Sequence, residues 1–139
     1  MIIVTGLFET PLDVAGLVAG IRRPECGGLV AFEGTTRSPN HGRVVVRLEY
    51  EAYTERAEKQ LRAIAEEAAE RWELGGVLAV HRTGTCEVGE PSVVVAAAAP
   101  HRPEAFEAAR WLIDTIKAEV AVWKKEIFED GEAWVGTDC

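Results

Sequence analysis

Three of the four lysines of this chain lie within eleven residues, in the stretch IKAEVAVWKKE. They are Lys117, Lys124 and Lys125, whereas the rest of the chain supplies positive charge almost entirely with arginine. Arginine stays protonated, but lysine can change its pKa, give up a proton or act as a nucleophile. The stretch is therefore a candidate for proton-transfer or acyl-transfer chemistry. The alternative is a scaffold in which the lysines only form salt bridges with Glu119 and Glu126.

Other cations stand at loops and helix ends. Arg37 lies in the polar loop 35–43, which is longer than a tight hairpin needs. His101 and Arg102 directly precede Pro103, a residue typical of a first helical turn. Free N–H groups and the positive end of the helix dipole make such a start an anion-binding position. We therefore expect a small anion site, suited to a phosphorylated metabolite or a carboxylate.

The composition excludes several function classes. The formal net charge of −8 argues against a nucleic-acid partner, which would call for a basic surplus. No apolar run reaches the roughly 18 residues of a bilayer span, so no membrane partner is expected. The start lacks a basic n-region, which predicts a cytoplasmic location. The spacing of cysteines and histidines predicts no metal site, and no cofactor is expected.

The distance between the candidate cations predicts an assembly. Arg102 and Lys117 are fifteen residues apart on one predicted helix, or roughly 22 Å at 1.5 Å per residue. One small ligand cannot easily touch both ends of that helix. Either there are two sites, or one site is shared between two copies of the chain, with Lys117 of one facing His101 and Arg102 of the other. We therefore hypothesise a homodimer with composite sites.

Periodicity and turn residues predict the elements that must position these side chains. A length of 139 residues predicts one domain, covering 1–139. The order of strands and helices predicts an α+β fold with helices on one face of a sheet. The expected strands are 2–8, 27–34, 44–52, 77–88 with a kink at Gly84, and 92–100; Asp130-Gly131 predicts a final hairpin. The first expected helix is 11–21, with Thr10 as its N-cap and Pro11 as its first residue. The second is capped by Thr54 and has an apolar stripe of Ala57, Leu61, Ile64, Ala65, Ala68 and Trp72. The third is opened by Pro103 and has a core stripe of Phe106, Ala109, Leu112, Ile113, Ile116 and Val120.

The two adjacent lysines fall in an extended segment after the last helix. Strand side chains alternate, so Lys124 shares a face with Glu126, and Lys125 points the other way. If Lys124 lines a pocket, its neighbour faces away from that pocket.

Several stretches together resemble the large, catalytic subunit family of molybdopterin synthase. They are GGLVAFEGTTRSPNHG, LEYEAY, the helix ending in RW, VHRTG, PHRPEAFEAA, IKAEVAVWKKE and the WV that follows it, and they run from about residue 27 to 135. The resemblance implies an α/β hammerhead-like fold with an additional antiparallel β subdomain. It also implies a homodimer that binds a small ubiquitin-like subunit at each end. The Gly-Gly thiocarboxylate of that subunit would donate sulfur to cyclic pyranopterin monophosphate, forming the molybdopterin dithiolene.

The resemblance also implies the site residues. Those expected to bind substrate are Thr35, Thr36, Arg37, His101, Arg102, Lys117, Lys124, Lys125 and Glu126. Lys117 is the first candidate for general acid/base, and Lys124 for stabilising the tail carbonyl or the phosphate. The sequence departs from the family at Ala121, where a proline is common, and it ends at Cys139, before a longer family tail. The competing interpretation is a non-catalytic dimeric module that binds a phosphorylated metabolite or a partner's C-terminal tail.

Overall fold

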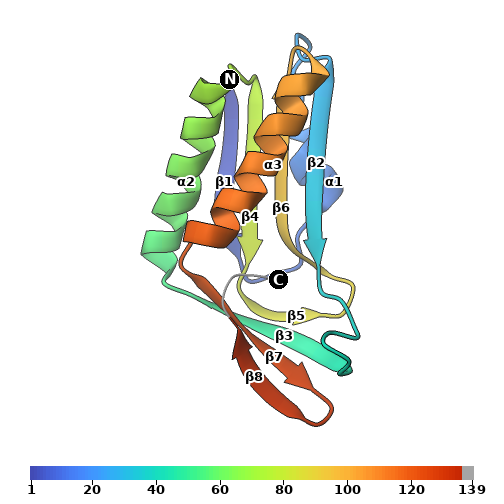
Figure 1. Ribbon diagram of the computed structural model, residues 1–139. Helices are drawn as coiled ribbons and strands as arrows, with labels where there is room; N and C mark the ends of the chain where they lie inside the picture. Colours follow the sequence, from blue (N-terminus) through green and yellow to red (C-terminus); the bar gives the residue numbers. More distant parts are fainter. Residues whose placement is uncertain (136–139) are drawn as a thin grey trace.

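Two four-stranded sheets organise the computed structural model, which describes residues 1–135 (Figure 1). In the first sheet, with strand order β1-β4-β6-β2, β1 runs parallel to β4 and the other neighbours are antiparallel. The second sheet, with order β5-β3-β7-β8, is antiparallel throughout. The predicted α+β class with a separate antiparallel sheet is therefore confirmed. The strands are β1 (Ile2–Phe8), β2 (Gly28–Thr35), β3 (Val45–Ala52), β4 (Gly76–Arg82), β5 (Gly84–Glu87), β6 (Pro91–Ala99), β7 (Val122–Phe128) and β8 (Gly131–Val135).

Helices cover both faces of the first sheet. The helices α2 (Thr54–Arg71) and α3 (Arg102–Glu119) lie side by side on one face, and α1 (Val14–Ala19) lies on the other (Figure 1). The expectation of helices on one face only is wrong. The reason lies in β4 and β6, whose side chains are apolar on both faces, so each face must be covered. Alternate residues of β6 accordingly belong to two separate buried clusters.

Helix boundaries differ from the sequence expectations at their starts. The first helix begins at Val14 rather than near Pro11, because the Asp13 side chain caps it by accepting from the N–H of Gly16 at 3.2 Å. Thr54 is the first residue of α2 rather than its cap. Phe106 is 62% exposed and lies outside the core stripe of α3, which uses Ala105, Ala108, Ala109, Leu112, Ile113 and Ile116.

The segment 77–88 is two strands rather than one kinked strand. After β4 the chain reaches Gly84, whose φ of +77° suits glycine, and it continues as β5 in the second sheet. The predicted final hairpin is present, but its connection is Glu129-Asp130, since Gly131 already pairs with Phe128. At Gly84 the chain leaves the first sheet and enters the second, at the end of the first sheet where α3 also ends (Figure 1).

Across the described residues, none of the helices combines the length and apolarity needed to cross a membrane.

Candidate functional site

A pocket of about 280 Å³ opens where the first sheet, α3 and the second sheet meet. We call it the junction pocket. Its walls come from the end of β2 and the following loop, from β3 and β7, and from the last turn of α3. Its lining residues are Phe32, Glu33, Gly34, Thr35, Thr36, Arg37, Asn40, Val45, Leu48, Tyr50, Ser92, Lys117, Lys124 and Glu126.

Two lysines from different elements meet in the junction pocket. Lys117 comes from the last turn of α3, and Lys124 comes from β7, in the second sheet. Both also line a narrow inner recess of about 20 Å³, room for about one water molecule. Lys124 is 6% exposed, which is rare for a lysine without a charged partner. Its partner is Glu126, with Nζ and Oε1 3.6 Å apart.

A line of polar side chains joins Lys124 to the loop that carries Arg37. The Glu126 carboxylate oxygen that faces Lys124 also accepts from Asn40 Nδ2 at 2.9 Å. The Asn40 amide oxygen in turn accepts from Arg37 Nη2 at 2.9 Å. Lys124, Glu126 and Asn40 are buried, whereas Arg37 is exposed at the mouth. Along this wall the groups follow one another in the order guanidinium, amide, carboxylate and ammonium.

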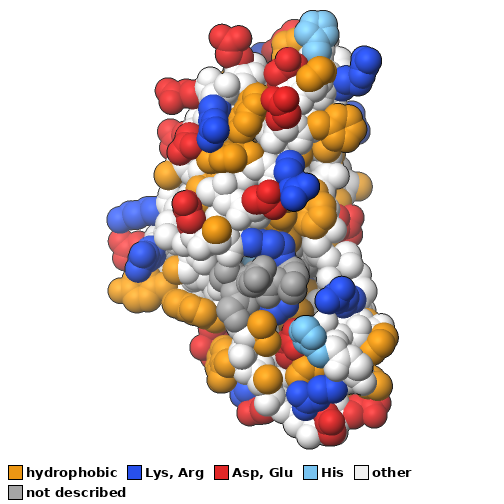
Figure 2. All heavy atoms as spheres, viewed as in Figure 1, with side chains coloured by type: hydrophobic (Ala, Val, Ile, Leu, Met, Phe, Trp, Pro, Cys, Tyr) orange, Lys and Arg blue, Asp and Glu red, His pale blue; other side chains and the backbone are white. Residues whose placement is uncertain are grey.

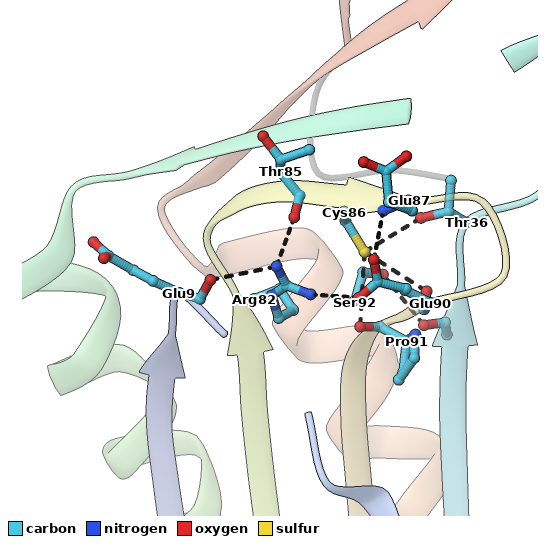
Figure 3. Close-up of polar contacts among 10 residues, drawn as sticks. Glu9, Thr36, Arg82, Thr85, Cys86, Glu87, Glu90, Pro91 and Ser92 are labelled. Carbon is cyan, nitrogen blue, oxygen red and sulfur yellow. Dashed lines mark hydrogen bonds and ion pairs between the residues drawn. The ribbon is translucent and has the colours of Figure 1, made fainter. Parts of the chain in front are cut away.

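The buried Arg82 lies near Thr36, one of the lining residues, and holds the backbone around it (Figure 3). Arg82 Nη1 donates to Glu90 Oε2 at 3.0 Å, and Nη2 donates to the carbonyl of Thr85 at 2.6 Å. The Glu90 carbonyl accepts from the N–H of Thr36 at 3.1 Å. The Thr36 hydroxyl lies 3.5 Å from the Cys86 sulfur, and burial raises the pKa of the Cys86 thiol. These contacts fix the end of β2, from which Arg37 extends.

His81 lines the inner recess together with Tyr50 and the two lysines. Its Nδ1 lies 2.7 Å from the carbonyl of Arg82, and its ring meets Tyr50 edge-on at 5.0 Å. Burial lowers the pKa of His81 to about 4, and the nearby Lys117 charge adds to the effect. His81 is therefore neutral at pH 7, and Nδ1 carries the proton that it donates to the carbonyl.

Lys125 is not brought to the junction pocket. It lies on the opposite face of β7, where its Nζ is 3.0 Å from Glu132 and 5.5 Å from the ring centre of Trp134. The predicted alternation of Lys124 and Lys125 is confirmed, and the assignment of Lys125 to the same pocket has no geometric support.

His101 and Arg102 lie far from Lys117, at the other end of α3. His101 occupies the N-cap position with extended backbone and no side-chain cap, and both residues are exposed. Within one copy of the chain they do not reach the junction pocket. The predicted separation along the helix is thus present.

Several lining residues had no role in the sequence analysis, among them the polar residues Asn40, Tyr50, His81 and Ser92. Tyr50 could have been found from the sequence. It is two residues from the apolar Leu48 in one strand, so both side chains lie on the same, inward face. His81 is an ionisable residue inside a fully buried strand, which is itself unusual. Asn40 and Ser92 carried no comparable signal.

The face of the molecule that carries α2 and α3 has mixed charge. On the face shown in Figure 2, acidic and basic side chains are interspersed over the two long helices, and basic side chains also border the place where α3 meets the second sheet. Among residues 1–135, no group of three histidine, cysteine, aspartate or glutamate side chains is placed to hold a metal ion.

Comparison with known proteins gives consistent matches. The model of a family described as MoaE protein matches residues 7–119. A Bacillus subtilis (strain 168) relative named molybdopterin synthase catalytic subunit is 41% identical over 130 residues, covering 94% of this chain and 83% of its own length. A crystal structure of molybdopterin synthase from Staphylococcus aureus superposes with a TM-score of 0.90 at 35% identity, covering 94% of this chain and 96% of that one. A Helicobacter pylori structure, described as a complex of subunits 1 and 2 of molybdopterin-converting factor, shares the fold at a TM-score of 0.78 and 16% identity, over 94% and 89% of the two chains.

Proposed function

Because the chain belongs to the MoaE protein family, we propose that it is the catalytic subunit of a molybdopterin synthase, acting in molybdenum cofactor biosynthesis. In this reaction, sulfur passes from the C-terminal thiocarboxylate of a small ubiquitin-like subunit to cyclic pyranopterin monophosphate, and two transfers form the dithiolene. The observation that carries the proposal is the meeting of Lys117 and Lys124 with Arg37 in one pocket of a chain with these relatives.

The junction pocket suits an anionic substrate. A guanidinium binds phosphate oxygens through paired charge-assisted hydrogen bonds, and Arg37 stands at the mouth where a phosphate would enter. The volume of about 280 Å³ lies near the lower end of the range for small-molecule sites. Thr35 and Thr36 lie in the same wall, with the hydroxyl of the buried Thr36 directed to Cys86.

The lysines suit the chemistry of acyl–sulfur cleavage. When the thiocarboxylate sulfur bonds to a substrate carbon, hydrolysis of the acyl–sulfur bond frees the sulfur and leaves the small subunit as a carboxylate, its new oxygen coming from water. Negative charge builds on oxygen during this step, and a cation placed beforehand lowers the barrier. We assign Lys117 as general acid/base and Lys124 as the cation beside the tail carbonyl or the phosphate. Glu126 holds Lys124 in position.

His101 and Arg102 enter the proposal through a second copy of the chain. They lie at the opposite end of α3 from Lys117, so one copy cannot supply all these cations to one ligand. A two-fold dimer could bring them beside the junction pocket of the partner subunit. The homodimer, the single domain over 1–139 and the cytoplasmic location all stay predictions.

Reconstitution tests the proposed function. The purified chain is mixed with a small partner that ends in a Gly-Gly thiocarboxylate and with cyclic pyranopterin monophosphate, and the products are read by mass. Gain of two sulfurs by the pterin is the expected result. Tight binding of the partner tail or the pterin without sulfur transfer would instead support the non-catalytic binding module. That alternative accounts for the anion site without needing lysine in particular.

A further inference from the structure

Asn40 occupies a central place in the polar line of the junction pocket. It is 7% exposed, although it lies in the loop between β2 and β3. Its amide oxygen accepts from Arg37 and its amide nitrogen donates to Glu126, both at 2.9 Å. Since a carboxylate only accepts and a guanidinium only donates, these two partners fix which way the amide points.

The backbone around Asn40 is held as firmly as its side chain. The N–H and carbonyl of Asn40 pair with the carbonyl and N–H of Arg43, at 2.9 and 3.0 Å. The two residues between them, His41 and Gly42, both have positive φ, +52° and +73°, as in a two-residue hairpin turn. This turn places the Asn40 amide between the loop and β7.

The amide separates two opposite charges that would otherwise compete. Without it, Arg37 and Glu126 would be free to form a direct ion pair across the gap. In such a pair the guanidinium would be neutralised, and Glu126 would be drawn from Lys124, which lies 3.6 Å away. A neutral residue with one acceptor and one donor keeps both charges apart and both partners hydrogen-bonded.

We propose that Asn40 is a positioning residue, whose neutral amide holds the Arg37 guanidinium ready for the phosphate of the substrate and reserves the Glu126 carboxylate for Lys124. This inference rests on the proposed function for the identity of the substrate, but the anion-binding part can be tested alone. The nearest isosteric change, Asn40→Asp, keeps the shape and replaces the donor by a second carboxylate. That carboxylate would pair with Arg37 and repel Glu126.

The first test measures inorganic phosphate binding to the isolated full chain by calorimetry. We expect Asn40→Asp to raise the phosphate Kd by about tenfold or more, comparable with Arg37→Ala. Asn40→Ala, which removes the tether without adding a charge, should raise it less. His41→Asp is the matched control, because it adds a carboxylate to the same turn at an exposed position where a positive φ suits aspartate. It should change the Kd by less than about twofold.

Several results would overturn the proposal. These are a wild-type chain that binds no phosphate, an Asn40→Asp variant that binds as tightly as wild type, or a His41→Asp variant that is weakened as much. If Asn40→Asp fails to fold, Asn40→Ala decides, and an unchanged Kd refutes the role.

The second test uses the reconstituted synthase. The KM for the cyclic pterin should rise in Asn40→Asp more than kcat falls, whereas a merely structural defect would lower the amount of active protein and leave KM unchanged. Absence of sulfur transfer by the wild-type chain would reject the proposed function, while the phosphate comparison would still decide on Asn40.

Discussion

Lys124 and Lys125 are neighbours in the chain, yet their ammonium groups lie on opposite faces of β7. Lys124 Nζ is 3.6 Å from Glu126 inside the junction pocket, and Lys125 Nζ is 3.0 Å from Glu132 outside it. The side chain of Lys124 is 7% exposed and that of Lys125 is 23% exposed. Substitution of Lys124 or of Lys125 therefore removes the same charge at neighbouring positions, once inside the pocket and once outside it.

Lys124→Ala should lose most sulfur transfer, and Lys125→Ala should lose much less. The reason is that only Lys124 presents its charge to the pocket. Initial rates in the reconstituted reaction, at equal amounts of folded protein, measure the contrast. A larger loss in Lys125→Ala would show that the face assignment does not describe the working enzyme.

Lys117→Ala should keep the fold and the dimer and still lose sulfur transfer by about a hundredfold or more, as expected for removal of a general acid/base. Lys59→Ala is the control, since Lys59 is a lysine on the exposed face of α2 with its side chain 77% exposed. Circular dichroism and light scattering would verify the structure of both variants. Near-wild-type turnover by Lys117→Ala, with thiocarboxylated partner supplied, would refute its role.

Composite sites predict recovery of activity when two inactive variants are mixed. Lys117→Ala and Arg102→Ala should each be inactive alone. If Lys117 and Arg102 act at one site from different subunits, a mixed dimer has one site that lacks both and one that is intact. Random exchange at equal amounts would then restore about a quarter of wild-type activity. No recovery after verified subunit exchange, or a strict monomer in light scattering, would contradict the dimeric site.

The stability of the fold should fall as the pH falls from about 6.5 toward 4 because of His81. Its folded pKa is lowered to about 4 while an unfolded histidine titrates near 6.5, so in this window the unfolded state binds the extra proton. Stability from this group is complete above pH 6.5 and is lost as the pH approaches 4, with a full effect of about 3 kcal/mol. Urea unfolding of wild type and His81→Asn at pH 7 and pH 4.5 measures it. Equal pH dependence in both proteins would exclude His81 as the cause.

Cys86 should resist alkylation in the folded chain. Burial raises its thiol pKa, and its sulfur lies against Thr36 and the carbonyls of Glu90 and Pro91. Because the thiolate is the reactive form, iodoacetamide should modify the half-buried Cys26 before Cys86 and reach Cys86 only in urea. Peptide mapping by mass measures both positions. Fast modification of Cys86 without loss of structure would show that its surroundings open in solution.

Apart from the division of 77–88 into β4 and β5, the order of elements was predictable because each element carries a local signal. The apolar run of β6, the stripes of α2 and α3 and the alternation of β7 depend on side chains within one segment. The passage of the chain between sheets at Gly84 was not predictable, since a single glycine indicates a bend without saying which strand comes next. The packing of α1 on the other face of the first sheet is a tertiary contact, and no local sequence pattern indicates it.

The candidate site was predictable only in part, because local sequence patterns do not record contacts between distant segments. Lys117, Lys124 and Arg37 became candidates through residue type and position, and the family resemblance singled out Lys124 over Lys125. The structure brings the three to one pocket. Asn40 was missed because its importance lies in two contacts, one three residues away and one 86 residues away. His101 and Arg102 were placed correctly at a helix start, but only an assembly could join them to the lysines.

Because the junction pocket is built from both sheets, partial unfolding of one sheet would abolish the site before the whole chain unfolds. Lys117 belongs to a helix packed on the first sheet, which supplies most of the buried apolar strand residues. Lys124 belongs to the second sheet, which adds fewer buried apolar side chains to the same core. Segments with less buried apolar surface open at lower free energy than the core. Partial opening of the second sheet would separate the two ammonium groups while α2 and α3 stay folded. In a denaturant series, turnover would then disappear before the helical signal does, and amide exchange in β7 and β8 would outpace that in β4 and β6.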